Sequence, residues 1–291
     1  MQIDERRTAA NGLEFGYLAC GDDGPLALCL HGFPDSAHTW RHLLPELAAA
    51  GYRAVAPWLR GYAPTSLDPK GRYQNGASVA DVAALHDVLG GDSSAVLIGH
   101  DWGARIATGA AVHEPERWSK LATLALPPGG VVAAGIFSYE QLKRSFYMWL
   151  FQTPLADFIV PMNDLAFIDG LWGDWSPGYD AKEDLDHVKE SLRDPANLAA
   201  AIGYYRATIS GVGVVPEYQA QENAIGGTPP QPHLYLHGRD DGCLGVDLLD
   251  NIDAFLPSPG SRSVIVDGAG HFLQLEQPAV VNKAILDHLA Q

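Results

Sequence analysis

An aspartate inside a glycine-flanked turn is the first feature of the sequence that could do chemistry. The residues Gly99-His100-Asp101-Trp102-Gly103 follow an apolar run that predicts a strand, and a helical pattern with small first residues comes after them. This order is typical of a nucleophile elbow, a sharp turn whose middle side chain projects into the site. The Gly-x-Asp-x-Gly pattern recurs at 238–242, but no clear helix with small residues follows it there. We therefore expect Asp101 to be a nucleophile.

An aspartate at this position, in place of a serine, restricts the reaction. Attack by a carboxylate on an ester or amide carbonyl would form an anhydride, which is a high-energy intermediate. Attack on a saturated carbon that bears a strained or good leaving group forms an ordinary ester, which water can then cleave. The residue type therefore predicts an alkyl electrophile as substrate and disfavours an esterase or a lipase.

His271 is the residue best placed to activate water. It follows a predicted strand and a glycine-rich turn, and it precedes the last helical pattern of the chain. It should share the carboxyl edge of the sheet with Asp101, where catalytic groups gather in open α/β sheets. A neutral imidazole can deprotonate water, and a carboxylate on its other nitrogen fixes the tautomer and stabilises the cation. Asp241, just past another predicted strand, is the expected carboxylate, and Asp240 is the alternative.

Hydrolysis of an aspartyl ester creates a tetrahedral oxyanion that needs N–H donors. Each preorganised donor is worth roughly 3 kcal/mol. The backbone N–H of Trp102 is one candidate, and the second is expected from Phe33. The loop around Phe33 reads His31-Gly32-Phe33-Pro34, and a simple turn is the other interpretation of it. We expect the substrate pocket to be lined by His31, Phe33, Pro34 and Trp102.

The elements that must position these groups follow an α/β pattern. Short apolar runs rich in β-forming residues alternate with longer helical patterns, which predicts parallel strands joined by crossover helices. The candidate strands are Leu13–Ala19, Leu26–Leu30, Arg53–Pro57, Ser94–Ile98, Leu121–Leu126, His233–Leu236 and Ser263–Val266. The candidate helices are Thr39–Ala50, Val79–Leu89, Gly103–His113, Val246–Phe255 and Pro278–Leu289. We expect a mostly parallel eight-stranded sheet flanked by helices.

A stretch of different composition interrupts this pattern. Between residues 128 and 221 the chain has aromatic-rich helical segments punctuated by Pro and Gly, without a convincing strand. A length of 291 residues suits one large α/β unit that carries an insertion. We expect residues 1–127 and 222–291 to form the core and residues 128–221 to form a helical cap.

Composition and charge limit the classes of molecule that the protein is expected to bind. The formal net charge is −16, so the surface should repel nucleic acid and anionic lipid, and small neutral substrates are favoured. The three cysteines, Cys20, Cys29 and Cys243, are too few and too unpatterned for a disulfide framework or a zinc site. The first residues are charged where a signal peptide needs an apolar stretch, and the longest uncharged run, 121–139, is broken by prolines and glycines. We expect a cytoplasmic protein, without a membrane span and without a metal.

Together, these motifs resemble those of the epoxide hydrolase branch of the α/β-hydrolase superfamily. The resemblance rests on His31-Gly32-Phe33-Pro34, Gly99-His100-Asp101-Trp102-Gly103, Asp241 and Gly270-His271, and it spans nearly the whole chain. It implies the α/β-hydrolase fold. Haloalkane and haloacetate dehalogenases share part of these motifs. The core motifs therefore indicate the class of mechanism but do not identify the leaving group of the substrate. The haloacetate enzymes carry Arg at the position of Trp102, and this chain departs from that pattern.

Two cap tyrosines carry the distinction from dehalogenases. In the epoxide hydrolase family two tyrosines donate hydrogen bonds to the epoxide oxygen, since an alkoxide leaves poorly unless it is protonated. The segment 145–152 is similar to that around the first tyrosine, and Gly203-Tyr204-Tyr205-Arg206 is similar to that around the second, which implies Tyr147 and Tyr205 as donors. The alternative is that both are core aromatics of cap helices, and we favour that interpretation for Tyr204.

Three functions follow, in order of preference. The first is hydrolysis of a small neutral epoxide to a vicinal diol with water, without a metal or organic cofactor, by a monomer or a homodimer. The second is a haloalkane dehalogenase that uses the same aspartate, with Trp102 as halide donor. The third is a ligand-binding protein on an inactive hydrolase scaffold, which the intact Asp101, Asp241 and His271 disfavour.

Overall fold

The computed structural model describes residues 1–291, and an eight-stranded sheet forms its centre. The strand order is β1-β2-β4-β3-β5-β6-β7-β8. The first two strands pair antiparallel with each other, β2 also pairs antiparallel with β4, and all the remaining pairs are parallel. The bounds are β1 Asp4–Ala10, β2 Leu13–Cys20, β3 Leu26–Leu30, β4 Arg53–Pro57, β5 Ala95–His100, β6 Trp118–Leu124, β7 His233–Gly238 and β8 Arg262–Val266. The predicted mostly parallel sheet is confirmed.

The central strands are buried on both faces. Every residue of β3, β5 and β7 is buried, because helices cover the two sides of a parallel sheet and leave no face to solvent. This is why these strands were visible as short apolar runs. β1 escaped the sequence analysis because it is a largely exposed edge strand with the charged run Asp4 to Arg7.

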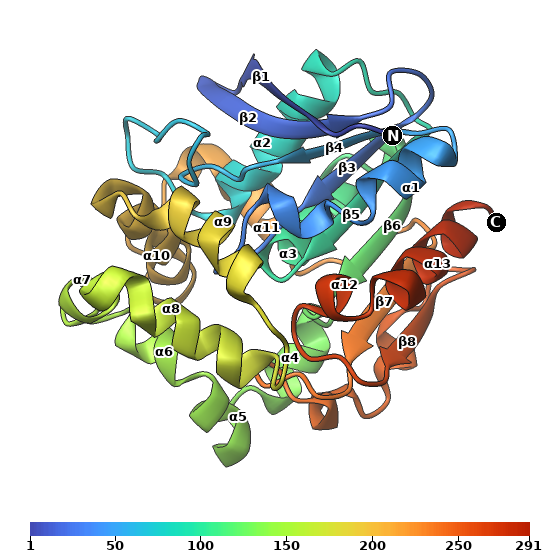
Figure 1. Cartoon of the computed structure of the whole chain (residues 1–291). Helices are drawn as coiled ribbons and strands as arrows, with labels where there is room; N and C mark the ends of the chain where they lie inside the picture. The colour runs from blue at the N-terminus through green and yellow to red at the C-terminus, as the bar shows by residue number, and fades with distance from the viewer.

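Helices flank the sheet on both sides, as Figure 1 shows. Helices α2, α3 and α11 pack against one another on one face, and α1, α12 and α13 lie on the other. Their bounds are α1 Leu44–Ala49, α2 Asn75–Val88, α3 Trp102–His113, α11 Gln219–Ala224, α12 Leu273–Glu276 and α13 Pro278–Leu289. The helix predicted over Val246–Phe255 is wrong as a continuous element, because Asn251 takes a left-handed conformation and leaves two short 3-10 turns, Val246–Leu249 and Ile252–Phe255.

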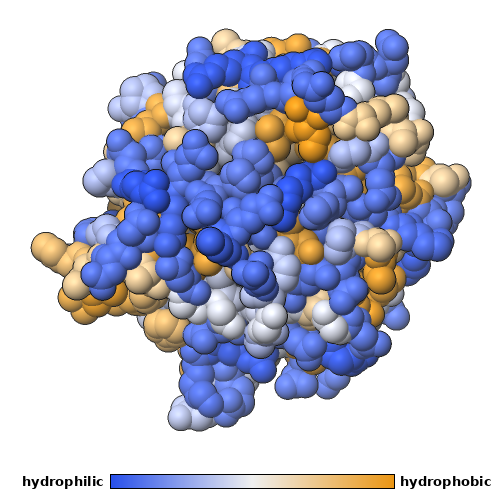
Figure 2. Space-filling model, in the orientation of Figure 1, coloured by the Kyte–Doolittle hydropathy of each residue, from blue (hydrophilic) through white to orange (hydrophobic).

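The segment between β6 and α11 consists mainly of helices, which lie together on one side of the sheet in Figure 1. They are α4 Gly129–Gly135, α5 Tyr139–Arg144, α6 Phe146–Leu150, α7 Ala156–Ile159, α8 Met162–Trp175, α9 Lys182–Leu192 and α10 Pro195–Ser210. In the same orientation, Figure 2 shows a mostly hydrophilic face with apolar residues gathered at the left edge, over α7 and the start of α8. Leu155, Phe158 and Met162 are exposed there. None of the helices has the length and apolar character needed to cross a bilayer.

Candidate active site

The turn between β5 and α3 has the geometry of a nucleophile elbow. Asp101 adopts φ 52° and ψ −120°, a conformation that is uncommon for a residue other than glycine. The two flanking glycines are required by space, because a Cβ on Gly99 would lie 2.3 Å from the carbonyl oxygen of Gly103, and one on Gly103 would lie 2.1 Å from that of Leu30. The predicted close crossing of strand and helix is therefore present, and it holds the Asp101 side chain out of the turn.

The carboxylate of Asp101 is buried and held on one side by backbone donors. Its Oδ1 accepts a hydrogen bond of 2.8 Å from the N–H of Phe33, and the N–H of Trp102 also donates to the carboxylate. These are the two N–H groups that the sequence predicts as oxyanion donors. Burial raises the pKa of Asp101, while His271 and the Phe33 N–H oppose that rise. The other oxygen, Oδ2, lies 3.7 Å from Nε2 of His271.

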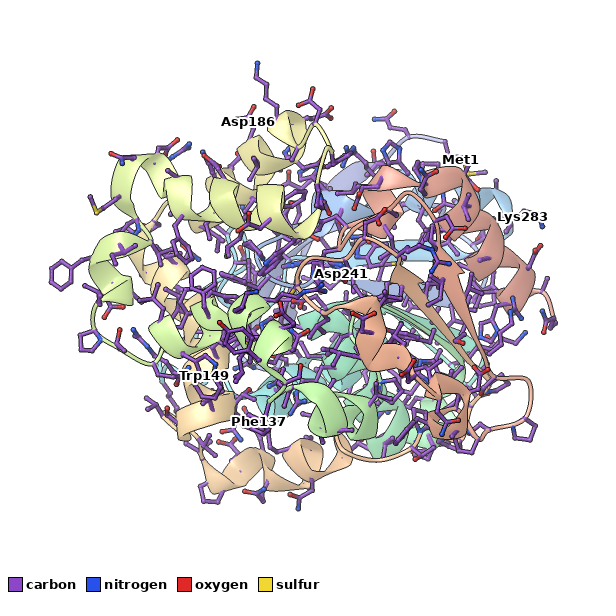
Figure 3. All side chains as sticks on the ribbon, turned by 90° about the horizontal axis from the view of Figure 1, so that it is seen from below. Met1, Phe137, Trp149, Asp186, Asp241 and Lys283 are labelled. Atoms are coloured by element: carbon purple, nitrogen blue, oxygen red, sulfur yellow. The ribbon has the colours of Figure 1, made fainter.

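His271 and Asp241 form a buried pair behind Asp101. Nδ1 of His271 lies 3.0 Å from Oδ2 of Asp241, and the other carboxylate oxygen accepts hydrogen bonds from the N–H groups of Cys243 and Leu244. Asp240 is exposed, so the geometry selects Asp241 from the two adjacent aspartates. In Figure 3, Asp241 lies near the centre of the molecule, between the sheet and the inserted helices.

The charges around His271 favour its protonated form. Burial lowers the pKa of His271, but the hydrogen-bonded Asp241 carboxylate and the charge of Asp101 outweigh burial and raise it overall. The same interactions lower the pKa of Asp241, although burial acts in the opposite direction. Nε2 of His271 has no hydrogen-bond partner in the protein. In the neutral form of His271, this nitrogen is therefore free to accept a proton from a bound molecule.

A cavity of about 390 Å³ opens in front of Asp101. We call it the Asp101 cavity, and its lining includes Trp102, Tyr147 and Tyr205. The rings of Tyr147 and Tyr205 are 5.6 Å apart, and that of Tyr205 lies 4.8 Å from Trp102. Burial raises the pKa of both tyrosines well above the ordinary value, and the charge of Asp101 acts in the same direction. Both are therefore neutral phenols that can donate a hydrogen bond into the cavity.

Tyr204 differs from its neighbour Tyr205. Its hydroxyl donates to the carbonyl of Arg60 at 2.9 Å and lies 3.4 Å from the hydroxyl of Ser78. It does not line the Asp101 cavity. This placement agrees with the interpretation of Tyr204 as a core aromatic.

Of the four residues expected to line the pocket, only Trp102 borders the Asp101 cavity; His31, Phe33 and Pro34 do not. The reason lies in how this loop is held. His31 uses both ring nitrogens, one with the carbonyl of Gly32 and one with the N–H of Leu59. Phe33 packs its ring 5.2 Å from Tyr205, and the carbonyl of Pro34 accepts a hydrogen bond from a cap tryptophan. The loop thus supports the site from behind and presents the Phe33 N–H to Asp101.

Several groups beside the site were missed from the sequence. Nε2 of His100 bonds the carbonyl of His271 at 2.9 Å, and its other ring nitrogen lies 3.6 Å from Asp35. On the far side of Asp241, Nε2 of His237 lies 3.7 Å from the carboxylate. His100 could have been suspected because it precedes Asp101. No sequence pattern indicates Asp35 or His237, because only the fold brings them next to the site.

The cluster with metal-ligand chemistry is Asp241, Cys243 and His271, whose ligand atoms lie within 4.8 Å of one another. Its donor set fits a metal poorly. The Asp241 carboxylate already accepts hydrogen bonds from the His271 imidazole and from two backbone N–H groups. Burial raises the pKa of the Cys243 thiol well above its ordinary value. A neutral thiol is a weak metal ligand.

Proteins similar to this chain match it over nearly its whole length. A family model described as the alpha/beta hydrolase fold matches residues 25–278. The human protein named epoxide hydrolase 4 is 32% identical, with 98% of this chain and 78% of that protein covered. Epoxide hydrolase A of Mycobacterium tuberculosis is 30% identical, with 98% and 97% covered. The crystal structure of epoxide hydrolase A from Mycobacterium thermoresistibile superposes with a TM-score of 0.82 at 28% identity and covers 99% of this chain and 98% of that one.

The elbow, the buried histidine–aspartate pair and these full-length similarities agree with one another. The chain belongs to the α/β-hydrolase fold family and, within it, to the epoxide hydrolase family.

Proposed function

We propose that this protein hydrolyses epoxides to vicinal diols through an ester formed on Asp101. The observation that carries the proposal is the placement of two neutral phenols, Tyr147 and Tyr205, on the cavity into which an elbow carboxylate projects. A carboxylate supplies the nucleophile, and the phenols supply the proton that an alkoxide leaving group needs. The names of the relatives support the same reaction class.

In the first step, Oδ2 of Asp101 attacks a carbon of the epoxide ring. Oδ1 is engaged by the Phe33 N–H, so Oδ2 is the oxygen available for attack. The new bond joins Oδ2 to the ring carbon while the bond from that carbon to the epoxide oxygen breaks. The epoxide oxygen takes a proton from Tyr147 or Tyr205 and becomes the hydroxyl of the alkyl group.

In the second step, water cleaves the ester. Nε2 of His271 accepts a proton from water, and the hydroxide attacks Cγ of Asp101, with Asp241 stabilising the imidazolium. The negative charge develops on Oδ1, to which the N–H of Phe33 already donates, and the N–H of Trp102 also acts on this carboxyl group. Collapse of this oxyanion breaks the bond between Cγ and Oδ2, and Oδ2 leaves as a hydroxyl of the diol after it takes the proton from the His271 imidazolium. The proton of the new Asp101 carboxylic acid returns to the tyrosinate that the first step formed, which restores the free enzyme.

The helices of residues 128–221 act as a cap over this chemistry. They contribute both phenols, and the core contributes the nucleophile, the base and the N–H donors. We propose residues 1–127 and 222–291 as the core. Helix α11 packs against α2 and α3 of the core although the predicted boundary falls inside it.

One experiment tests the covalent step directly. A single turnover in water enriched in heavy oxygen, with enzyme in excess over styrene oxide, should leave one heavy oxygen in the peptide that contains Asp101. In the variant His271→Ala, the same peptide should instead accumulate the mass of the alkyl group. Diol formed at a normal rate with an unlabelled Asp101 peptide would contradict the proposal, whereas labelling of the peptide that contains Asp240 would relocate the nucleophile.

A second candidate, haloalkane dehalogenation, is supported by one observation. The indole N–H of Trp102 is buried, has no hydrogen-bond partner and belongs to a residue that lines the Asp101 cavity, so it could donate to a leaving halide. Release of halide from a panel of chloroalkanes and bromoalkanes, with no diol from styrene oxide, would select this function. Diol formation without halide release would select epoxide hydrolysis.

A further inference from the structure

Arg105 is a half-buried arginine of α3 without an ionic partner. Its Nε is buried and has no hydrogen-bond partner, and Glu222 acts on the guanidinium only through its charge at longer range. Arg60 shows what a buried arginine ordinarily has, because it binds both oxygens of Asp81 at 2.6 and 2.7 Å. A buried N–H of a charged group without an acceptor is costly, which points to an acceptor that the protein itself does not supply.

The partner would come from the Asp101 cavity, which Arg105 lines. Asp101 directly precedes α3, and Arg105 and Thr108 of that helix line the same cavity. Arg105 follows the nucleophile by about 6 Å along the helix axis, at about 1.5 Å per residue. On α10, Thr208 lines the same cavity one turn after Tyr205. The cavity therefore extends beyond the reacting groups toward a guanidinium and two hydroxyls.

Arg105 is the single cationic side chain among the residues that line the Asp101 cavity. No other arginine or lysine lines the cavity, and burial lowers the pKa of His233 to about 3, so that imidazole is neutral. Burial also lowers the pKa of Arg105, with Glu222 opposing, but an arginine stays protonated in proteins. Glu222 accepts a hydrogen bond from the N–H of Gly76 and makes no direct bond to the guanidinium.

We propose that Arg105 and Thr208 form a subsite for a carboxylate, and that the preferred substrates are epoxides that carry a carboxylic acid at the end of a short carbon chain. A planar guanidinium binds a carboxylate through two parallel hydrogen bonds. The hydroxyl of Thr208 accepts from Nδ2 of Asn75 at 2.8 Å, which leaves its O–H free to donate. Thr108 donates its hydroxyl to the carbonyl of Ala104 and contributes a lone pair and a methyl group instead.

This inference rests on the proposed epoxide hydrolysis and changes the expected substrate. The preference for a neutral substrate followed from the net charge of the whole chain. A guanidinium inside the cavity acts at much shorter range than the surface charges, which salt screens beyond about 10 Å. The local site therefore decides which ligand charge is accepted.

The test compares acids with neutral partners of the same shape. Terminally epoxidised hexanoic and octanoic acids are assayed beside their primary amides, with wild type, Arg105→Met, Arg105→Lys and the control Lys143→Met. Lys143 is exposed and lies outside the cavity lining, so its variant removes the same charge elsewhere. We expect wild type to prefer one of the acids over its amide in kcat/KM, and Arg105→Met to lower that ratio roughly 10- to 100-fold. Arg105→Lys should retain part of the preference, and Lys143→Met should retain it in full.

A binding measurement separates failure of the subsite from failure of the reaction. Calorimetry with octanoate and octanamide on the unmodified protein needs neither a variant nor turnover. Octanoate should bind more tightly than octanamide, and Arg105→Met should remove the difference. If no epoxide is opened while this difference is present, the carboxylate subsite stands and the proposed reaction fails. Equal binding of the two ligands, or an acid preference that survives in Arg105→Met, overturns the subsite.

Discussion

Removal of the two cap hydroxyls is the perturbation that separates the proposed reaction from its alternatives. Tyr147→Phe and Tyr205→Phe each delete one phenol and leave the ring that packs in the cap. Loss of one preorganised donor to a developing oxyanion costs about 2.7–4 kcal/mol, or roughly 100- to 1000-fold in rate. Both hydroxyls are buried, where such a bond is strong. We expect each single variant to slow ester formation roughly 100-fold and the double variant to slow it further.

The fold should tolerate these changes. The partner of the Tyr147 hydroxyl outside the tyrosine pair is the thiol of Cys243 at 3.5 Å, which is a weak hydrogen bond. Its loss should change the free energy of unfolding by less than about 1 kcal/mol. Tyr204→Phe is the matched control, since it removes a buried hydroxyl from the same helix as Tyr205. It should cost about 1 kcal/mol of stability, because the Arg60 carbonyl loses a donor, while ester formation stays within about twofold.

The assay is rapid mixing with excess styrene oxide, followed by tryptophan fluorescence. Two tryptophans lie close enough to report on the ester, because the Trp102 ring is 4.8 Å from Tyr205 and the Trp175 ring is 5.0 Å from His271. The amplitude and rate of the first phase give the step in which the epoxide opens. A double variant that opens the epoxide at the wild-type rate would refute the role of the phenols. An equal loss in Tyr204→Phe would show that packing, and not proton donation, sets the rate.

Three further outcomes follow from the site. Asp241→Asn should slow ester hydrolysis by roughly 10³- to 10⁴-fold, whereas Asp240→Asn should change it less than twofold, as measured by decay of the trapped ester. The base must be neutral, and the Asp241 carboxylate raises the pKa of His271 against the effect of burial, so the hydrolysis rate should fall as the pH drops through the pKa of His271. Asp241→Asn should move the midpoint downward in a pH series. Gly103→Ala should lower the free energy of unfolding by at least about 2 kcal/mol in urea titrations, because its Cβ would meet the carbonyl of Leu30.

The elbow could be predicted from the sequence because its constraint is local. Gly99 and Gly103 are needed because the strand and the helix cross closely at this turn. All residues of the pattern therefore lie within five consecutive positions of the sequence. The buried parallel strands were visible for a similar reason, since a strand covered on both faces is a continuous apolar run. β1 was hidden because it pairs at the edge of the sheet, where side chains carry no burial pattern.

Other parts of the site depend on contacts between distant segments. Asp240 and Asp241 are indistinguishable as letters, and only the direction of the chain after β7 buries one and exposes the other. Tyr147 and Tyr205 are far apart in the sequence and were identified by family resemblance, not by spacing. Arg105 differs from an ordinary helical arginine because no carboxylate forms an ion pair with it, and no sequence pattern indicates this.

The cap and the core are joined at the residues that would do the chemistry. The carbonyl of Trp175, at the end of α8, accepts hydrogen bonds from the N–H of Gly242 at 3.1 Å and from that of His271 at 3.0 Å. Its ring lies 5.0 Å from Tyr147 and 5.0 Å from His271. One cap residue thus fixes the loop after Asp241, the backbone of the proposed base and one proposed proton donor. Since the phenols are proposed for the first step and the imidazole for the second, a single element positions the groups proposed for both, and the inserted helices contribute to the proposed site as much as the sheet does.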